Sequence, residues 1–275
     1  MNWKYWKWWV GSTVYSSLEA IISSRYFPRT RYFPRGVSWL FDVQRFIGTR
    51  SLGVVFDAGA NTGQTVQRIL RYAPDTEIYS FEPALDTFQI LKAKYENLKN
   101  VHCYNLALGA RPDKLVLQLR ENSEHNTLVK GGTLDGFPIR SQVVDVTTVD
   151  SLVASHQLSH LDILKMDVQA WEMEVMRGAA NLIANQNVMF VFSEVAFRRD
   201  ANEMQQFDEL HSYLEQNGFL LCGFYDPVRY GPRKEFVYFA NALYLNPECR
   251  LKWTGNQGEW LEWLTNQTVL SPRGK

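Results

Sequence analysis

Short apolar runs alternate with amphipathic stretches from residue 51 onward, and this alternation organises most of the chain. The apolar runs predict strands at about 53–57, 77–82, 100–104, 161–167 and 188–194. The amphipathic stretches predict helices near 63–73, 85–97, 148–157, 171–184 and 203–217. Strands and helices that alternate in this way form a mostly parallel sheet covered by helices on both faces. We therefore expect an α/β fold.

Two strand pairs modify this regular alternation. Apolar runs at 219–225 and 236–245 are separated by Asp226-Pro227 and Gly231-Pro232, which exclude a helix, so these runs are expected to pair antiparallel. Another pair of strand-like runs, 114–120 and 140–147, predicts an inserted β-hairpin. The polar stretch 121–136 between them follows the third strand, at the end of the sheet where ligands bind. It is either a lid that contacts the substrate or a solvated hairpin tip.

The first 50 residues differ from the rest of the chain. Five aromatic residues between positions 3 and 9 are interleaved with Lys4 and Lys7. This composition fits a helical flap packed on the main domain or on a second copy of the chain, a substrate lid, or an interfacial membrane anchor within 3–22. We expect three regions: an aromatic-rich helical appendage (1–50), the main domain (51–248, with the insertion at 114–147) and a C-terminal tail (249–275).

Composition limits the classes of partner and the cellular location that we expect. The 275 residues include 29 Lys and Arg against 29 Asp and Glu, and this neutral balance gives no reason to expect a nucleic-acid partner. Three widely spaced cysteines fit buried thiols in the reducing cytoplasm better than disulfides or a metal site. The sequence contains neither an apolar run long enough to span a membrane nor a secretory leader. We expect a cytoplasmic protein, with peripheral membrane contact as the alternative.

A glycine loop is the most informative motif. The first strand runs into Asp57-Ala-Gly59-Ala60-Asn61-Thr-Gly63, and the second strand ends on Glu82-Pro83. A strand, a glycine turn, a helix and a strand-end acid form a nucleoside-binding half-site, because the acid accepts hydrogen bonds from ribose hydroxyls. The loop lacks both the dinucleotide spacing and the phosphate-gripping lysine of a P-loop. The expected ligand is therefore a nucleoside without a pyrophosphate.

The ordered series of motifs over residues 50–200 resembles the FkbM family of S-adenosylmethionine-dependent methyltransferases. It continues from the glycine loop through Asn105-Leu-Ala107, Thr148–Leu152 and Ile163–Val168 to Glu172–Ala179. The resemblance implies a Rossmann-like class I fold with a seven-stranded sheet and S-adenosyl-L-methionine as cofactor. It places Gly59, Ala60, Asn61 and Gly63 along the methionine half and Asp57 near its amino group. Glu82, followed by Pro83, would bind the ribose, and Asn105 and Ala107 would lie near the adenine.

Three residues are candidates for the chemistry. Asp167 and Glu194 end the fourth and fifth strands and face the expected methyl group, and His125 lies in the polar insertion. Each could orient an acceptor or take its proton. No histidine or cysteine set suggests a metal site.

One departure from the family pattern bears on mechanism. Where the family has glutamate and glycine after Asp167-Val, this chain has Gln169 and Ala170, and Gln169 cannot act as a base. The resemblance favours O-methylation of a sugar, glycolipid or polyketide-like small molecule. N-methylation and a cofactor-binding module without turnover are the alternatives.

Overall fold

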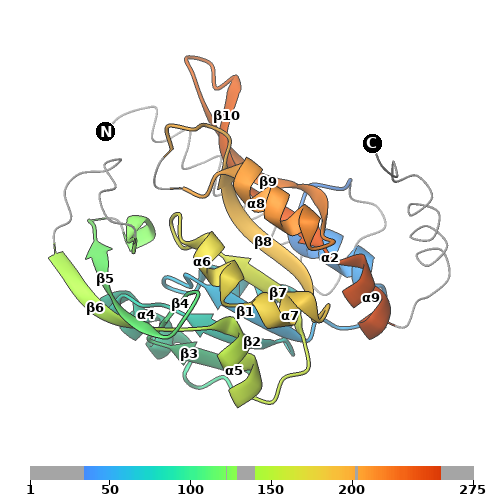
Figure 1. Ribbon diagram of the computed structural model, residues 1–275, viewed down its shortest axis with the longest axis horizontal. Coiled ribbons are helices and arrows are strands. Elements are labelled where there is room, and N and C mark those ends of the chain that lie inside the picture. Colours follow the sequence, from blue (N-terminus) through green and yellow to red (C-terminus); the bar gives the residue numbers. More distant parts are fainter. Residues whose placement is uncertain (1–33, 122, 129–139, 202–203, 255–275) are drawn as a thin grey trace.

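A seven-stranded sheet forms the centre of the protein (Figure 1). The computed structural model describes residues 34–121, 123–128, 140–201 and 204–254. The first five strands of the sheet are parallel, and β10 runs antiparallel to both of its neighbours. In sheet order the strands are β3 (Val101–Tyr104), β2 (Glu77–Phe81), β1 (Val54–Ala58), β7 (Leu161–Met166), β8 (Val188–Ala196), β10 (Phe236–Leu245) and β9 (Leu220–Tyr230). The expected mostly parallel α/β sheet with a terminal antiparallel hairpin is confirmed.

Both faces of the sheet are apolar, which explains why helices cover both. Neighbouring residues of one strand point to opposite faces, so Val55 joins one buried cluster and Phe56 the other. One face packs against α2 (Trp39–Ile47), α3 (Gln64–Tyr72), α4 (Leu85–Tyr95) and α9 (Pro247–Thr254). The other packs against α5 (Val149–Ser155), α6 (Glu172–Arg177), α7 (Ala180–Ala184) and α8 (Phe207–Gln216).

The expected insertion forms a second, smaller sheet. Its strands are β4 (Ala107–Leu108), β6 (Arg140–Thr147) and β5 (Asp113–Leu119), and β5 and β6 pair antiparallel as predicted. The short strand β4 was not expected. A 3-10 turn, η1 (Ser123–His125), follows β5, and residues 129–136 of the predicted polar loop lie outside the described part.

Three boundaries differ from the sequence prediction. The helix expected over 171–184 is two helices, because Gly178 lies against Gly109: a Cβ on Gly178 would be 2.1 Å from the carbonyl oxygen of Gly109. The helix expected from 203 starts only at Phe207. The strand expected to end at 225 continues through Asp226-Pro227 to Tyr230. A proline is tolerated there because β9 is an edge strand, and register shifts in its pairing with β10 accommodate it.

Within the described residues, no helix has both the length and the apolar character needed to cross a bilayer. The division into appendage, main domain and tail stays a prediction.

Candidate active site

The glycine loop is held tightly between two strand ends. The N–H groups of Gly59 and Ala60 both donate to the carbonyl oxygen of Phe81, at the end of β2, over 3.0 Å. Gly59 has φ +73°, and a Cβ there would lie 1.9 Å from the carbonyl oxygen of Asp167, at the end of β7. Only glycine fits this position, because both the left-handed backbone and the close approach exclude a side chain. The loop is therefore fixed at the carboxyl edge of the parallel strands.

A buried ion pair lies directly under this loop. Lys165 and Asp57 are register partners on neighbouring strands, and Lys165 Nζ is 3.0 Å from Asp57 Oδ1. The ammonium also donates to the carbonyl oxygen of Gly59 (3.3 Å) and lies 3.7 Å from Asp167 Oδ2. Burial alone would lower the pKa of Lys165, but Asp57 and then Asp167 more than offset it and raise that pKa above its usual value. Lys165 is therefore a permanent cation.

A cavity of about 740 Å³ opens above the loop and this lysine. It lies at the carboxyl ends of β1, β2, β7 and β8, where ligands bind in open α/β sheets. The small sheet closes one side of it through Leu117, Ser123, Glu124, Asn126 and Leu128, and β9 and β10 contribute Val228, Tyr238 and Phe239. Part of the polar insertion thus lines the cavity.

Glu82 reaches the cavity from the end of β2. Its Oε2 accepts from the N–H of Asn61 and its Oε1 from the N–H of Ala84, each over 2.9 Å. Burial raises its pKa to about 7, against the opposing effect of these two donors. Asn105 supports this corner from behind, because its side-chain amide donates to the carbonyl oxygens of Glu82 and Pro83.

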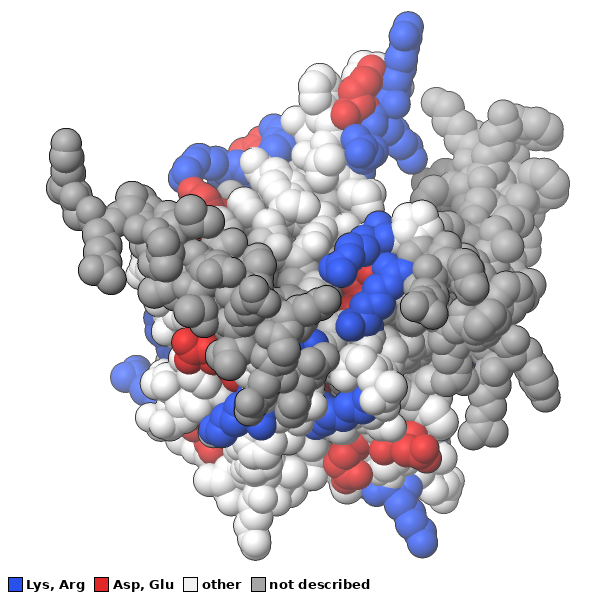
Figure 2. Space-filling model, turned by 90° about the vertical axis from the view of Figure 1, so that its right-hand side faces the viewer, with Lys and Arg blue, Asp and Glu red and all other residues white. Residues whose placement is uncertain are grey.

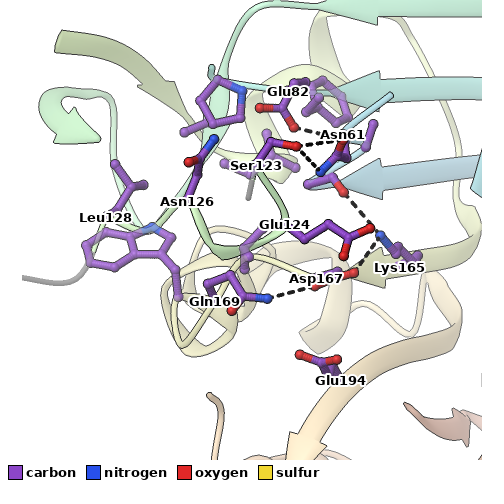
Figure 3. Close-up of a pocket in the computed structure, with 18 of the residues that line it drawn as sticks. Asn61, Glu82, Ser123, Glu124, Asn126, Leu128, Lys165, Asp167, Gln169 and Glu194 are labelled. Atoms are coloured by element: carbon purple, nitrogen blue, oxygen red, sulfur yellow. Dashed lines mark hydrogen bonds and ion pairs between the residues drawn. The ribbon is translucent and has the colours of Figure 1, made fainter. Parts of the chain in front are cut away.

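Two strand-end acids lie side by side in the cavity, at the ends of the neighbouring strands β7 and β8, in different surroundings (Figure 3). Asp167 has Lys165 beside it, and the Gln169 amide donates to its Oδ1 over 3.3 Å. Glu194 is the more buried of the pair, and burial, followed by the charges of Asp167 and Glu172, raises its pKa well above the usual range. The positive charge of Lys165 thus lies beside Asp167, whereas Glu194 holds its proton.

The chain around Gln169 is bent unusually. Gln169 and Ala170 both have left-handed backbones, with φ of +54° and +67°. The hydroxyl of Thr127, in the insertion, donates to the carbonyl oxygen of Gln169 over 2.9 Å and holds the bend in place. A glycine would adopt the Ala170 conformation without strain.

Most of the sequence-predicted site residues meet in this cavity. Eight of them line it: Gly59, Ala60, Asn61, Glu82, Pro83, Ala107, Asp167 and Glu194. Three others do not: Asp57 is buried beneath Lys165, Gly63 is the N-cap of α3, and Asn105 supports Glu82. The side chain of His125 lies outside the described part. Within that part, no group of three or more acidic, histidine or cysteine side chains is arranged to hold a metal ion.

Sequence reasoning missed three contributors to the site. Lys165 lies in an apolar strand, where it carried no motif of its own, although its alternation with Asp167 on β7 places both on one face. Glu172 is buried behind the cavity, and its Oε1 accepts from the N–H of Val168. Glu124 comes from the insertion and points toward Lys165 and Asp167 (Figure 3).

Comparison with known proteins identifies methyltransferases in two independent ways. The family model described as "Methyltransferase FkbM domain" matches residues 57–221. "Methyltransferase 1" of Beauveria bassiana (strain ARSEF 2860) is 30% identical over an alignment of 142 residues. The alignment covers 45% of this chain and 57% of that protein. The alignment thus spans little more than half of that relative's length.

Solved structures resemble the chain only distantly. M. capricolum TrmK with S-adenosyl-homocysteine aligns with a TM-score of 0.41 and 8% identity over 84% of each chain. Aeropyrum pernix fibrillarin with natively bound S-adenosyl-L-methionine aligns with a TM-score of 0.38 and 12% identity, over 70% of this chain and 66% of that one.

Glu172 makes stability depend on pH. Burial raises its pKa from 4.5 to about 7, so the folded state keeps a proton that the unfolded state has released. Stability therefore falls as pH rises from about 4.5 to 7, by roughly 3 kcal/mol for this group. We expect Glu172→Gln to gain about that much free energy of unfolding relative to wild type between pH 5 and pH 8, in urea titrations. The exposed control Glu96→Gln should parallel wild type; a parallel Glu172→Gln would contradict the assignment.

Ala170 stores backbone strain. Ala170→Gly should raise the free energy of unfolding by about 1 kcal/mol, because glycine adopts a left-handed backbone at little cost. Ala93→Gly, on the exposed face of α4, should lower the free energy of unfolding by about 1 kcal/mol. In a helix, glycine only increases the conformational entropy of the unfolded chain and relieves no strain. Chemical denaturation of both variants tests the sign; a loss of stability in both would show that position 170 is not strained.

Proposed function

This chain belongs to the FkbM methyltransferase family, and we propose on that basis that it transfers the methyl group of S-adenosyl-L-methionine to a hydroxyl of a small molecule. The observation that supports this most is the shared cavity. The glycine loop and Glu82, which suit a nucleoside, open into the same space as Asp167 and Glu194, which suit proton transfer. A cofactor and an acceptor can therefore meet in one enclosure.

The residues present fit the cofactor. Each oxygen of Glu82 accepts one N–H, and a carboxylate oxygen accepts two hydrogen bonds, so capacity remains for two ribose hydroxyls. The backbone of Gly59 to Asn61 would line the methionine half, and Pro83 and Ala107 the adenine. Asp57 is too deep to touch a ligand and acts through Lys165. The cofactor supplies a methyl group on a sulfonium, ready for attack by a nucleophile.

The protein's own part is alignment and proton transfer. Asp167 lies beside the Lys165 ammonium and accepts a hydrogen bond from the Gln169 amide, so as a carboxylate it can accept the proton that an acceptor hydroxyl loses as its oxygen gains the methyl group. Glu194, protonated at the end of the neighbouring strand, can donate a hydrogen bond that orients the acceptor. Gln169 thus serves to hold the base rather than to be one. Sugars, glycolipids and polyketide-like molecules are the acceptor classes to screen.

Glu82→Ala should abolish cofactor binding. Two charged hydrogen bonds to the ribose are lost, which corresponds to at least about a hundredfold in affinity. Calorimetric titration with S-adenosyl-L-methionine and S-adenosylhomocysteine measures this, with the exposed variant Glu96→Ala as control and thermal melts to verify folding. Unchanged affinity in a folded Glu82→Ala variant would refute the placement of the ribose.

Asp167→Asn should separate binding from turnover. We expect its affinity for the cofactor to stay within about threefold of wild type, while turnover falls by about 10²–10⁴-fold because the base is gone. Formation of S-adenosylhomocysteine with a panel of acceptors measures turnover, and Asp75→Asn, an exposed substitution, is the control. Cofactor binding by wild type without turnover on any acceptor would instead favour a binding module.

A further inference from the structure

The turn between β9 and β10 projects from the body of the protein (Figure 1). We call residues 226–236 the hairpin tip. Its apolar side chains are unusually exposed: Phe236 keeps 57% of its surface in water, Val228 42% and Tyr230 36%. Solvent-facing turns are normally polar, so a large exposed aromatic side chain at such a point indicates contact with something else.

The aromatic side chains form one patch that reaches the cavity. Tyr230 contacts Phe236 across the hairpin, with ring centroids 5.5 Å apart, and lies 5.9 Å from the ring of Tyr238. Tyr238 lines the cavity, as does Val228. Arg198 covers part of this patch, with its guanidinium 4.8 Å from the centroid of Tyr230. The patch therefore runs from the mouth of the cavity to the end of the hairpin.

The hairpin tip also carries more available positive than negative charge. Arg229, Arg233 and Lys234 are exposed, and none forms an ion pair with any residue in the described part of the chain. Of the two acids of the tip, only Asp226 is in an ion pair within the described part of the chain, and Glu235 keeps its negative charge. Asp226 pairs with Arg68 over 3.2 Å, and Glu235 Oε2 accepts from the N–H of Arg233. Figure 2, in which the hairpin stays at the top, shows Lys and Arg side chains gathered on this projection beside a smaller acidic patch.

The elements beside the hairpin tip do not cancel this charge. Arg198 and Arg199, which follow β8, each pair with an acid of their own segment, Asp200 and Asp208. The carboxylates of Asp200 and Asp208 are therefore already paired and do not neutralise Arg233 or Lys234.

We propose that the hairpin tip binds the surface of an anionic lipid bilayer. Aromatic rings favour the headgroup region, and lysine and arginine favour the negative charge of anionic lipids. A soluble anion would account for the cations but leave Phe236 exposed, whereas a bilayer satisfies both. The Trp- and Lys-rich segment at residues 3–9 has the same composition in the sequence, and stable attachment of a peripheral protein usually needs two such signals.

Binding in this orientation would turn the mouth of the cavity toward the membrane. If the proposed methyl transfer also holds, the acceptor belongs to the glycolipids among the candidate classes, because such a molecule reaches the cavity along the aromatic patch. The bilayer contact itself does not depend on the methyl transfer and is tested separately.

Co-sedimentation of the full-length protein with vesicles tests the proposal. Wild type should bind vesicles of 30% phosphatidylglycerol in phosphatidylcholine and bind pure phosphatidylcholine far more weakly. Lys234→Glu should weaken binding to the anionic vesicles by about tenfold, since it removes one attraction and adds a repulsion. Phe236→Ser should weaken it severalfold at every salt concentration, whereas the Lys234→Glu effect should shrink as salt rises.

Matched controls make the outcome decisive. Leu98 and Lys99 are also an exposed apolar and basic pair, at the opposite end of the molecule, so Leu98→Ser/Lys99→Glu should bind vesicles like wild type. Calorimetric affinity for S-adenosylhomocysteine should be equal in all variants, which separates failure of this proposal from failure of the proposed function. Vesicle binding by Phe236→Ser/Lys234→Glu that equals wild type would overturn the hairpin assignment, as would no vesicle binding by wild type. An equal loss in the Leu98→Ser/Lys99→Glu control, or a loss in Lys234→Glu with none in Phe236→Ser, would show that only non-specific charge is involved and would also overturn it.

Discussion

The ion pair between Lys165 and Asp57 is the interaction on which the site depends. A lysine in the middle of a covered sheet is stable only beside an anion, and its register partner on β1 supplies one at 3.0 Å. The same ammonium binds the carbonyl oxygen of Gly59 and faces Asp167, so one cation fixes the glycine loop and the charge of an acid in the cavity. The binding half and the reacting half of the site share this single support.

The difference between the two acids in the cavity follows from that support. Asp167 lies 3.7 Å from the cation, whereas Glu194, at the end of the neighbouring strand β8, is more buried and has Asp167 and Glu172 as negative neighbours. Two carboxyl groups of similar chemistry thus have different surroundings, and burial beside negative charge raises the pKa of Glu194. Glutamate in place of Gln169 would set a second carboxylate against Asp167, so the amide preserves the division that the lysine establishes.

The sequence predicted the sheet and its strand ends better than it predicted which side chains are buried at the site. Short apolar runs and the glycine loop were sufficient for the sheet, the strand ends and the position of Glu82, because these depend on local pattern. Asp57 looks in the sequence like a residue that contacts the ligand; its burial depends on Lys165, which lies 108 residues further along the chain. The break at Gly178 depends on a backbone contact with Gly109, and the course of β9 through Pro227 on its being an edge strand. Such features come from tertiary contacts, which the pattern does not contain.

The position of β10 has a consequence for how the protein is made. Among the strands of the described residues this one comes last, yet it lies inside the sheet, between β8 and β9. While the ribosome is still producing residues 236–245, β8 has no neighbour on that side and β9 has no partner in the sheet. The wall that carries Tyr238 and Phe239 is therefore assembled last, after the glycine loop and Glu82 can already be in place. The residues of the glycine loop and Glu82 thus leave the ribosome before the residues of β10 that close this side of the cavity.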